Sequence, residues 1–145
     1  MSEIKVDTLT GKTSAGNITV TSEGGSATMQ LQQGLCKTWI KYSDHDSALA
    51  SADSFNVSSI ADTDTGKVTV NFTNNMSSID FCFLANAHDM ALRAFAIAGY
   101  IPDETSTNIT TSKLVVWTGY TNNTNGGLAR SDSDIAMVTI HGDLA

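Results

Sequence analysis

The clearest feature of the sequence is a strict alternation of apolar and polar residues in short runs. Residues 67–73 (KVTVNFT) place two valines and a phenylalanine on one face of an extended strand and polar side chains on the other. Residues 55–60 (FNVSSI) precede this run, and the link 61–66 (ADTDTG) has Asp and Gly in positions typical of a turn. We therefore expect a β-hairpin here.

Further alternating or apolar runs predict more strands, joined by links rich in Asp, Asn, Ser and Gly. These runs are residues 36–42, 80–85, 113–118 and 135–141. Residues 81–84 (FCFL) are apolar on both faces, which favours a central strand covered on both sides. The expected fold is all-β, an antiparallel β-sandwich or jelly-roll-like knob preceded by an extended N-terminal β segment.

Residues 89–99 (DMALRAFAIAG) fit two structures. An Asp that can cap a helix, several good helix formers and a final Gly favour a helix. As a strand, the same residues place Arg93, Phe95 and Ile97 on one side and three alanines on the other. We favour the strand because the rest of the chain consists of alternating runs, and the helix stays open.

The first 34 residues differ from the rest of the chain. Two short alternating runs, residues 4–6 and 17–21, are separated by a Gly-, Ser- and Thr-rich stretch, and they have few apolar residues with which to form a core. We therefore divide the chain into an extended attachment or assembly segment, 1–34, and a compact knob, 35–145. Such a segment gains order from other copies or from a docking partner. The expected docking residues are Ile4, Val6, Leu9, Ile18 and Val20.

Composition and charge exclude several partners. The formal net charge is −7, so the chain lacks the basic surface with which proteins bind nucleic acid. No apolar run approaches the roughly 20 residues that span a bilayer, so we expect no membrane insertion. Charged residues make up only 16%, and 45 Ser, Thr and Asn residues supply the polar surface, which favours strands and turns.

The best candidate for chemistry is the triplet Asp44, His45 and Asp46, because two carboxylates beside an imidazole can bind a metal ion or act as a general base. A solvated polar loop over residues 44–53 is the favoured interpretation, since no helical pair of ligands occurs. The chain has two further histidines, His88 and His141. We interpret all three as surface histidines.

A second candidate, Asp62-Thr-Asp64-Thr-Gly66, resembles the opening of a calcium loop. The twelfth position holds Thr73 where a calcium loop needs Glu, so a hairpin turn is favoured. Sequence motifs of serine hydrolases, nucleotide-binding loops and zinc proteases are missing from the chain. We expect no enzymatic activity, no cofactor and no metal.

The two cysteines, Cys36 and Cys82, each lie in an apolar-rich stretch, and we expect buried free thiols. Two loops, residues 102–108 and 120–127, are long enough to carry surface contacts. Tyr100 and Tyr120 border these loops, and aromatic side chains in such places bind sugars or protein partners. The candidate recognition residues are Tyr100, Tyr120, Asn122 and Asn123.

Three stretches of the chain resemble tail-fibre and capsid-fibre virion proteins of marine bacteriophages, of the cyanophage or pelagiphage type. They are residues 4–13 with 16–20, residues 53–60 with 66–73, and residues 134–143. The resemblance spans most of the chain in the right order and rests on structural β patterns, without a catalytic motif.

The resemblance implies a homotrimeric, β-rich fibre tip or knob on the phage particle, made in the host cytoplasm and attached to other capsid or tail proteins through its N-terminal segment. The chain departs from long fibres in its brevity. A short tail appendage or capsid decoration protein therefore fits as well as a host-attachment fibre. The alternative function is a receptor-binding tip whose two loops contact cell-surface glycans.

Overall fold

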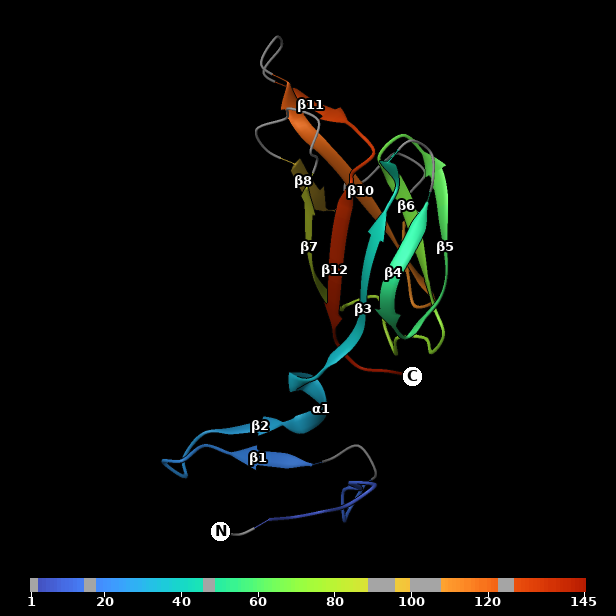
Figure 1. The fold of residues 1–145 in the computed structure, drawn as a ribbon. Coiled ribbons are helices and arrows are strands. Elements are labelled where there is room, and N and C mark those ends of the chain that lie inside the picture. Colours follow the sequence, from blue (N-terminus) through green and yellow to red (C-terminus); the bar gives the residue numbers. More distant parts are fainter. Residues whose placement is uncertain (1–2, 15–17, 46–48, 89–95, 100–107, 123–126) are drawn as a thin grey trace. The chain divides into compact units, whose positions relative to one another are not determined.

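Figure 1 shows the computed structural model of the chain, which describes residues 3–14, 18–45, 49–88, 96–99, 108–122 and 127–145. The chain divides into two compact units, Met1–Leu35 and Cys36–Ala145. The boundary that we predicted, between residues 34 and 35, lies one residue earlier. The boundary coincides with the change from a polar, Gly-rich sequence to alternating apolar runs.

The N-terminal unit contains one small hairpin. Strand β1 (Thr19–Thr21) pairs antiparallel with β2 (Thr28–Gln30), and the one-turn helix α1 (Leu31–Gly34) follows directly. Gly25 adopts φ 73° in the turn, a conformation that glycine tolerates without strain. The run 4–6, which we predicted as a strand, lies outside the described strands. Alternation alone does not make a strand where no neighbouring strand supplies hydrogen bonds.

The second unit is built from two antiparallel sheets (Figure 1). One has four strands in the order β4-β3-β12-β7, and the other has the order β11-β10-β6-β5, with β8 and β9 also paired with β10. The four-stranded sheet consists of β3 (Cys36–Ser43), β4 (Ala50–Phe55), β7 (Cys82–His88) and β12 (Ile135–His141). The six-stranded sheet consists of β5 (Val57–Asp64), β6 (Lys67–Phe72), β8 (Ala96–Gly99), β9 (Ile109–Thr110), β10 (Lys113–Asn122) and β11 (Gly127–Arg130).

The two sheets share one hydrophobic core. Alternate residues of β3, β6, β10 and β12 face inward, which is the expected consequence of a period of two along a strand. The buried side chains are Ile40, Tyr42, Val68, Val70, Phe72, Leu114, Val116, Ala136, Val138 and Ile140, joined by Met76 and Ala87. The prediction of an all-β, antiparallel fold is confirmed, whereas its finer assignment as a sandwich or jelly roll stays a prediction.

The predicted hairpin is present as β5 and β6, which pair antiparallel. Strand β5 continues to Asp64, so the turn is shorter than the six residues that we expected. The turn closes at Gly66, which has φ 63°. The predicted strand 135–141 coincides with β12.

The expectation that residues 81–84 form a central strand is wrong. Strand β7 stands at one end of the order of the four-stranded sheet and pairs with β12. Phe83 packs against the core, whereas Leu84 is 68% exposed. Apolar side chains on both faces of a strand therefore do not show that both faces are covered.

The polar loop expected over residues 44–53 is also corrected, because residues 50–53 belong to β4, which pairs with β3. Residues 50–55 (ASADSF) are mostly small and lack β-branched residues, so the sequence signal for a strand is weak here. Residues 96–99 form the strand β8, paired with β10, in agreement with the strand interpretation of that stretch. Residues 89–95 lie outside the described part of the chain.

The chain passes from one sheet to the other at Asn56, between β4 and β5. Asn56 has φ 59°, and its side chain is bonded on both sides. Its Oδ1 accepts from the backbone N–H of Asn74 at 2.7 Å, and its Nδ2 donates to Thr38 Oγ1 at 3.1 Å and to the carbonyl of Asn74 at 3.1 Å. Asn tolerates this left-handed conformation better than most residues. Asn56 therefore allows the change of direction between β4 and β5, and its side-chain hydrogen bonds stabilise it.

We expect Asn56→Ala to destabilise the second unit by about 2 kcal/mol, because it strains the backbone and removes these hydrogen bonds. Asn56→Gly keeps the backbone relaxed and is expected to cost about half as much. Urea unfolding followed by tryptophan fluorescence measures both. Equal losses for the two variants would contradict a contribution from backbone strain.

Candidate functional site

The predicted docking residues of the N-terminal unit are largely exposed. The exposed fractions are 86% for Ile4, 56% for Val6, 61% for Leu9 and 42% for Val20, whereas Ile18 is half-buried. Large apolar side chains at this exposure are normal singly, whereas contiguous apolar patches mark contact surfaces. Their role in docking stays a prediction.

The recognition residues that we predicted are placed only in part. Tyr120 and Asn122 belong to strand β10, opposite Ala129 and Gly127 of β11, so residues 120–122 of the predicted loop are strand. Residues 123–126 lie outside the described part of the chain. The side chain of Tyr120 is half-buried. Tyr100 and Asn123 lie outside the described residues.

The four-stranded sheet has an outer face that the sequence analysis missed. Residues directly opposite one another in antiparallel strands point to the same side of a sheet. One row across β4, β3, β12 and β7 is Phe55, Trp39, Thr139 and Leu84, and the next is Asp53, Lys41, Met137 and Asn86. Phe55 is 51% exposed and Met137 is 45% exposed, so apolar side chains on this outer face reach solvent.

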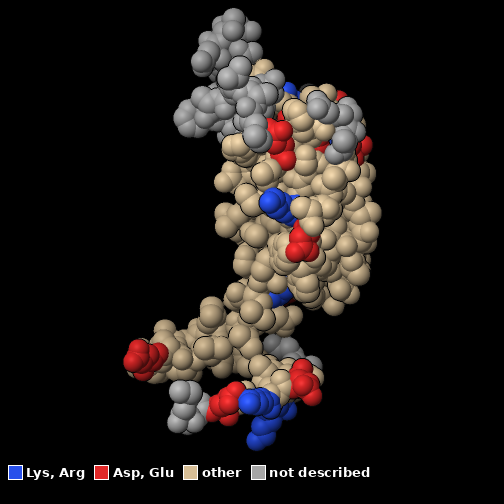
Figure 2. All heavy atoms as spheres, viewed as in Figure 1, with Lys and Arg blue, Asp and Glu red and all other residues tan. Residues whose placement is uncertain are grey.

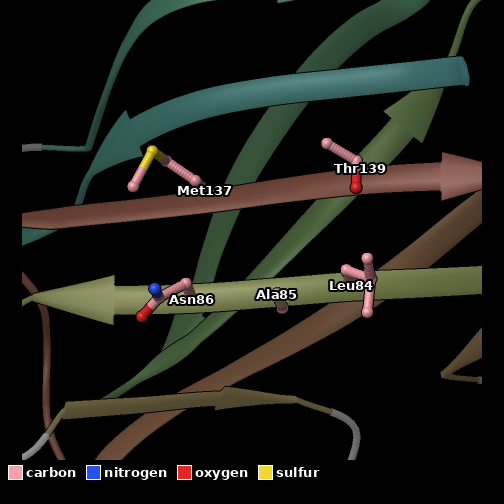
Figure 3. Close-up of a pocket in the computed structure, with 5 residues that line it drawn as sticks. All are labelled: Leu84, Ala85, Asn86, Met137 and Thr139. Carbon is pink, nitrogen blue, oxygen red and sulfur yellow. The ribbon is translucent and has the colours of Figure 1, made fainter.

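A shallow hollow of about 180 Å³ lies on the outer face, lined by Leu84, Ala85, Asn86, Met137 and Thr139 (Figure 3). In the view of Figure 2, Lys, Arg, Asp and Glu side chains occupy only a small part of the visible surface of the second unit. A surface poor in charge and partly apolar is suited to contact with another protein rather than with a small ion.

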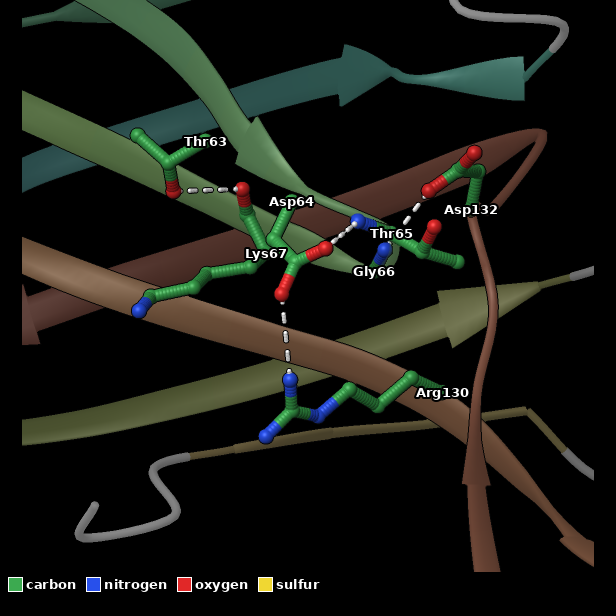
Figure 4. A network of polar contacts seen from close by, with 7 residues as sticks. All are labelled: Thr63, Asp64, Thr65, Gly66, Lys67, Arg130 and Asp132. Atoms are coloured by element: carbon green, nitrogen blue, oxygen red, sulfur yellow. Dashed lines mark hydrogen bonds and ion pairs between the residues drawn. The ribbon is translucent and has the colours of Figure 1, made fainter. Parts of the chain in front are cut away.

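A polar network ties the β5–β6 turn to the end of β11 and to the link that follows it (Figure 4). Gly66 donates its backbone N–H to Asp132 Oδ1 at 2.6 Å, and Arg130 Nη1 lies 3.2 Å from Asp64 Oδ2. The guanidinium of Arg130 also stacks 3.8 Å from the ring centroid of buried Trp117. The stretch that resembles a calcium loop is thus a hairpin turn, and Asp64 has a cationic partner.

The expectation that residues 44–53 form a solvated loop is wrong for Asp44. This residue directly follows β3 and is fully buried, with 0% of its surface exposed. Its Oδ1 accepts from the backbone N–H of Ser133 at 2.5 Å, and its own N–H donates to the carbonyl of Ser133 at 3.1 Å. This reciprocal pair joins the end of β3 to the residues before β12. The burial of Asp44 depends on contacts in the tertiary structure, so it could not be predicted from a single polar residue in the sequence.

Two buried oxygen atoms at this end of the core have no hydrogen-bond partner within the described residues, Oδ2 of Asp44 and the hydroxyl of Tyr42. Burial raises the pKa of the Asp44 carboxyl, and the charges of Asp132 and Asp62 raise it further, while the bond from Ser133 lowers it. Burial and the charge of Asp44 also raise the pKa of Tyr42. The ionised carboxylate of Asp44 is therefore a cost to the fold.

We expect Asp44→Asn to unfold at higher urea concentration than the natural chain at pH 7, in buffer free of divalent cations. Because the folded-state pKa of Asp44 is raised, its protonated form stabilises the fold, and this contribution is lost as pH rises above the ordinary aspartate range. The advantage of Asp44→Asn should therefore grow between about pH 4 and pH 7. An advantage that is independent of pH would contradict this account.

The cysteines and histidines are scattered. Cys36 is half-buried, with Sγ 3.1 Å from the carbonyl of Thr38, but Cys82 is exposed, which corrects the expectation that both thiols are buried. His45 Nδ1 lies 3.4 Å from Asp134 Oδ1. Within the described ranges, no three His, Cys, Asp or Glu side chains are grouped so as to hold a metal ion. None of the described helices has the length and apolar character needed to cross a membrane.

Comparison with protein-family models, with curated proteins and with solved structures gives no match for this chain. The functional interpretation therefore depends on the residues and surfaces described above.

Proposed function

We propose that this chain is a non-enzymatic structural component of a bacteriophage particle, a short fibre or appendage on the tail or capsid surface. Its N-terminal unit attaches it to the particle, and its two-sheet unit projects as the knob. The resemblance to virion fibre proteins supports this function, and the negative charge argues against a role in binding nucleic acid.

The observation that carries the proposal is the contrast between the two units. The second unit encloses a core of fully buried side chains, whereas the N-terminal unit leaves Ile4, Val6 and Leu9 more than half exposed. Burying these side chains on another subunit stabilises the contact by about 1.5–3 kcal/mol for each that is fully covered. An attachment segment has this property.

The test is the triple variant Ile4→Asp, Val6→Asp and Leu9→Asp, assayed for incorporation into phage particles and for self-association by light scattering. The matched control, Thr8→Asp, Thr10→Asp and Thr13→Asp, adds three charges to the same segment at exposed polar positions. We expect the first variant to lose incorporation or assembly and the control to keep both. A natural chain that is a stable monomer with an ordered N-terminal unit would overturn the proposal.

The alternative is a receptor-binding tip, and the same variants separate it from attachment. If the triple variant no longer enters particles but its second unit still binds host cells or glycans, recognition belongs to the knob. If cell binding is missing from both the natural chain and the variant, attachment remains as the function.

A further inference from the structure

Three Asp-x-Asp sequences, at residues 44–46, 62–64 and 132–134, come from distant parts of the chain. The fold brings members of all three together. The charges of Asp132 and Asp62 both act on Asp44, and His45 lies within ion-pair distance of Asp134. Like charges repel, so a cluster of this kind needs something to balance it.

The two unpartnered oxygens lie at this cluster. Asp44 Oδ2 and the Tyr42 hydroxyl are both buried, and the negative charge of Asp44 acts on Tyr42. Buried polar atoms almost always have a partner, and a bound water or ion is one of the explanations for an exception. The hydroxyl is a neutral oxygen within reach of the charge of Asp44, and it too has no hydrogen-bond partner among the described residues.

We propose that Asp44 and Asp132 bind a hydrated divalent cation, Ca²⁺ in the first place, at the end of the core beside Tyr42. Asp62 adds its negative charge from the exposed side of the cluster. A cation here supplies a partner for Asp44 Oδ2 and offsets the repulsion among the three carboxylates.

The ligand chemistry fits a loosely built oxygen site. Ca²⁺ accepts six to eight oxygen ligands in flexible geometry, including carboxylates, carbonyls and water. Asp132 Oδ1 is occupied by the N–H of Gly66, and Figure 4 shows its other oxygen pointing away from Gly66. Because the described residues contain no ready group of three side-chain ligands, water and backbone oxygens complete the coordination.

The degree of burial changes in steps across the cluster. Asp44 is fully buried, Asp132 is half-buried and Asp62 is exposed. A hydrated cation arriving from solvent therefore meets Asp62 first and loses part of its water shell at Asp132 and Asp44. Binding requires small shifts of these side chains, so we expect it to be coupled to stability.

The experiment is thermal unfolding of the full chain in EDTA and in increasing CaCl₂ at constant ionic strength. We expect a saturable rise in the midpoint of about 5–10 °C at a hundredfold excess over Kd. Asp44→Asn and Asp132→Asn should each shift saturation to at least tenfold higher Ca²⁺. Both keep an oxygen that can accept the bond from Ser133 or Gly66, so the fold is retained.

The matched control is Asp53→Asn, which removes one charge from exposed strand β4. It should respond to Ca²⁺ as the natural chain does. An equal response of all four proteins would mean general screening of a chain with net charge −7 and would overturn the proposal. A natural chain with no saturable response to Ca²⁺ would also overturn the proposal. Water would then be the partner of Asp44 Oδ2 and the Tyr42 hydroxyl. Terbium emission, sensitised through Tyr42 and weakened by Tyr42→Phe, locates the ion independently.

Discussion

Gly66→Ala is expected to destabilise the second unit by about 4 kcal/mol or more. Gly66 has φ 63°, where a side chain costs about 1–2 kcal/mol in strain. The added Cβ would also contact the carbonyl oxygen of Thr118 and lie 2.8 Å from the backbone N of Ser131. Both are backbone atoms, which cannot move aside without breaking strand pairing.

The substitution should also disturb neighbouring elements, because hydrogen bonds join Gly66 to β10 and to the residues between β11 and β12. The N–H of Gly66 donates to Asp132, its carbonyl accepts from the N–H of Thr118 at 2.9 Å, and the hydroxyl of Thr118 donates to the carbonyl of Ser131 at 2.7 Å. Urea unfolding measures the loss. The control is Thr65→Ala at the exposed neighbouring position, where a change below about 0.5 kcal/mol is expected. A loss of less than about 1 kcal/mol for Gly66→Ala would contradict the close approach of the Thr118 and Ser131 backbone to position 66.

Leu114→Ala is expected to cost about 3–4 kcal/mol. Leu114 lies on β10, the strand that pairs with β6, and it is 0% exposed in the core shared by both sheets. Truncation removes buried apolar surface and leaves a cavity that two sheets held by backbone hydrogen bonds cannot collapse to fill. The free energy of unfolding in urea tests this value.

The same substitution on the outer face is the control. Leu84 also lies in a strand, but it is 68% exposed, so Leu84→Ala should change the free energy of unfolding by less than about 0.5 kcal/mol. Equal losses at the two positions would mean that the outer face is covered in solution. That outcome would identify Leu84 as part of a contact with another subunit.

Both predictions concern the stability of the second unit, whereas the proposed attachment depends on the N-terminal unit. Substitutions in the core should reduce stability without a specific effect on attachment. Substitutions at Ile4, Val6 and Leu9 should impair attachment without lowering the stability of the core. The two-unit organisation thus allows stability and assembly to be measured by different variants.

The features that depend on local alternation could be predicted from the amino-acid sequence. The sequence predicted the β5–β6 hairpin, strand β12 and the all-β class, because a period of two with turn residues between runs leaves few other structures. It also indicated that the first 34 residues carry too few apolar side chains for a core, and the side chain of Ile4 is 86% exposed.

Which faces are covered and which polar residues come together could not be predicted from the sequence, because both depend on how the strands pack. Residues 81–84 are apolar on both sides, yet Leu84 lies on the outer face of the four-stranded sheet and is 68% exposed. Asp44 is buried, and its hydrogen-bond partner Ser133 is 89 residues away in the sequence. Burial and electrostatic environment depend on neighbours distant in sequence, whereas alternation indicates only the two sides of one strand.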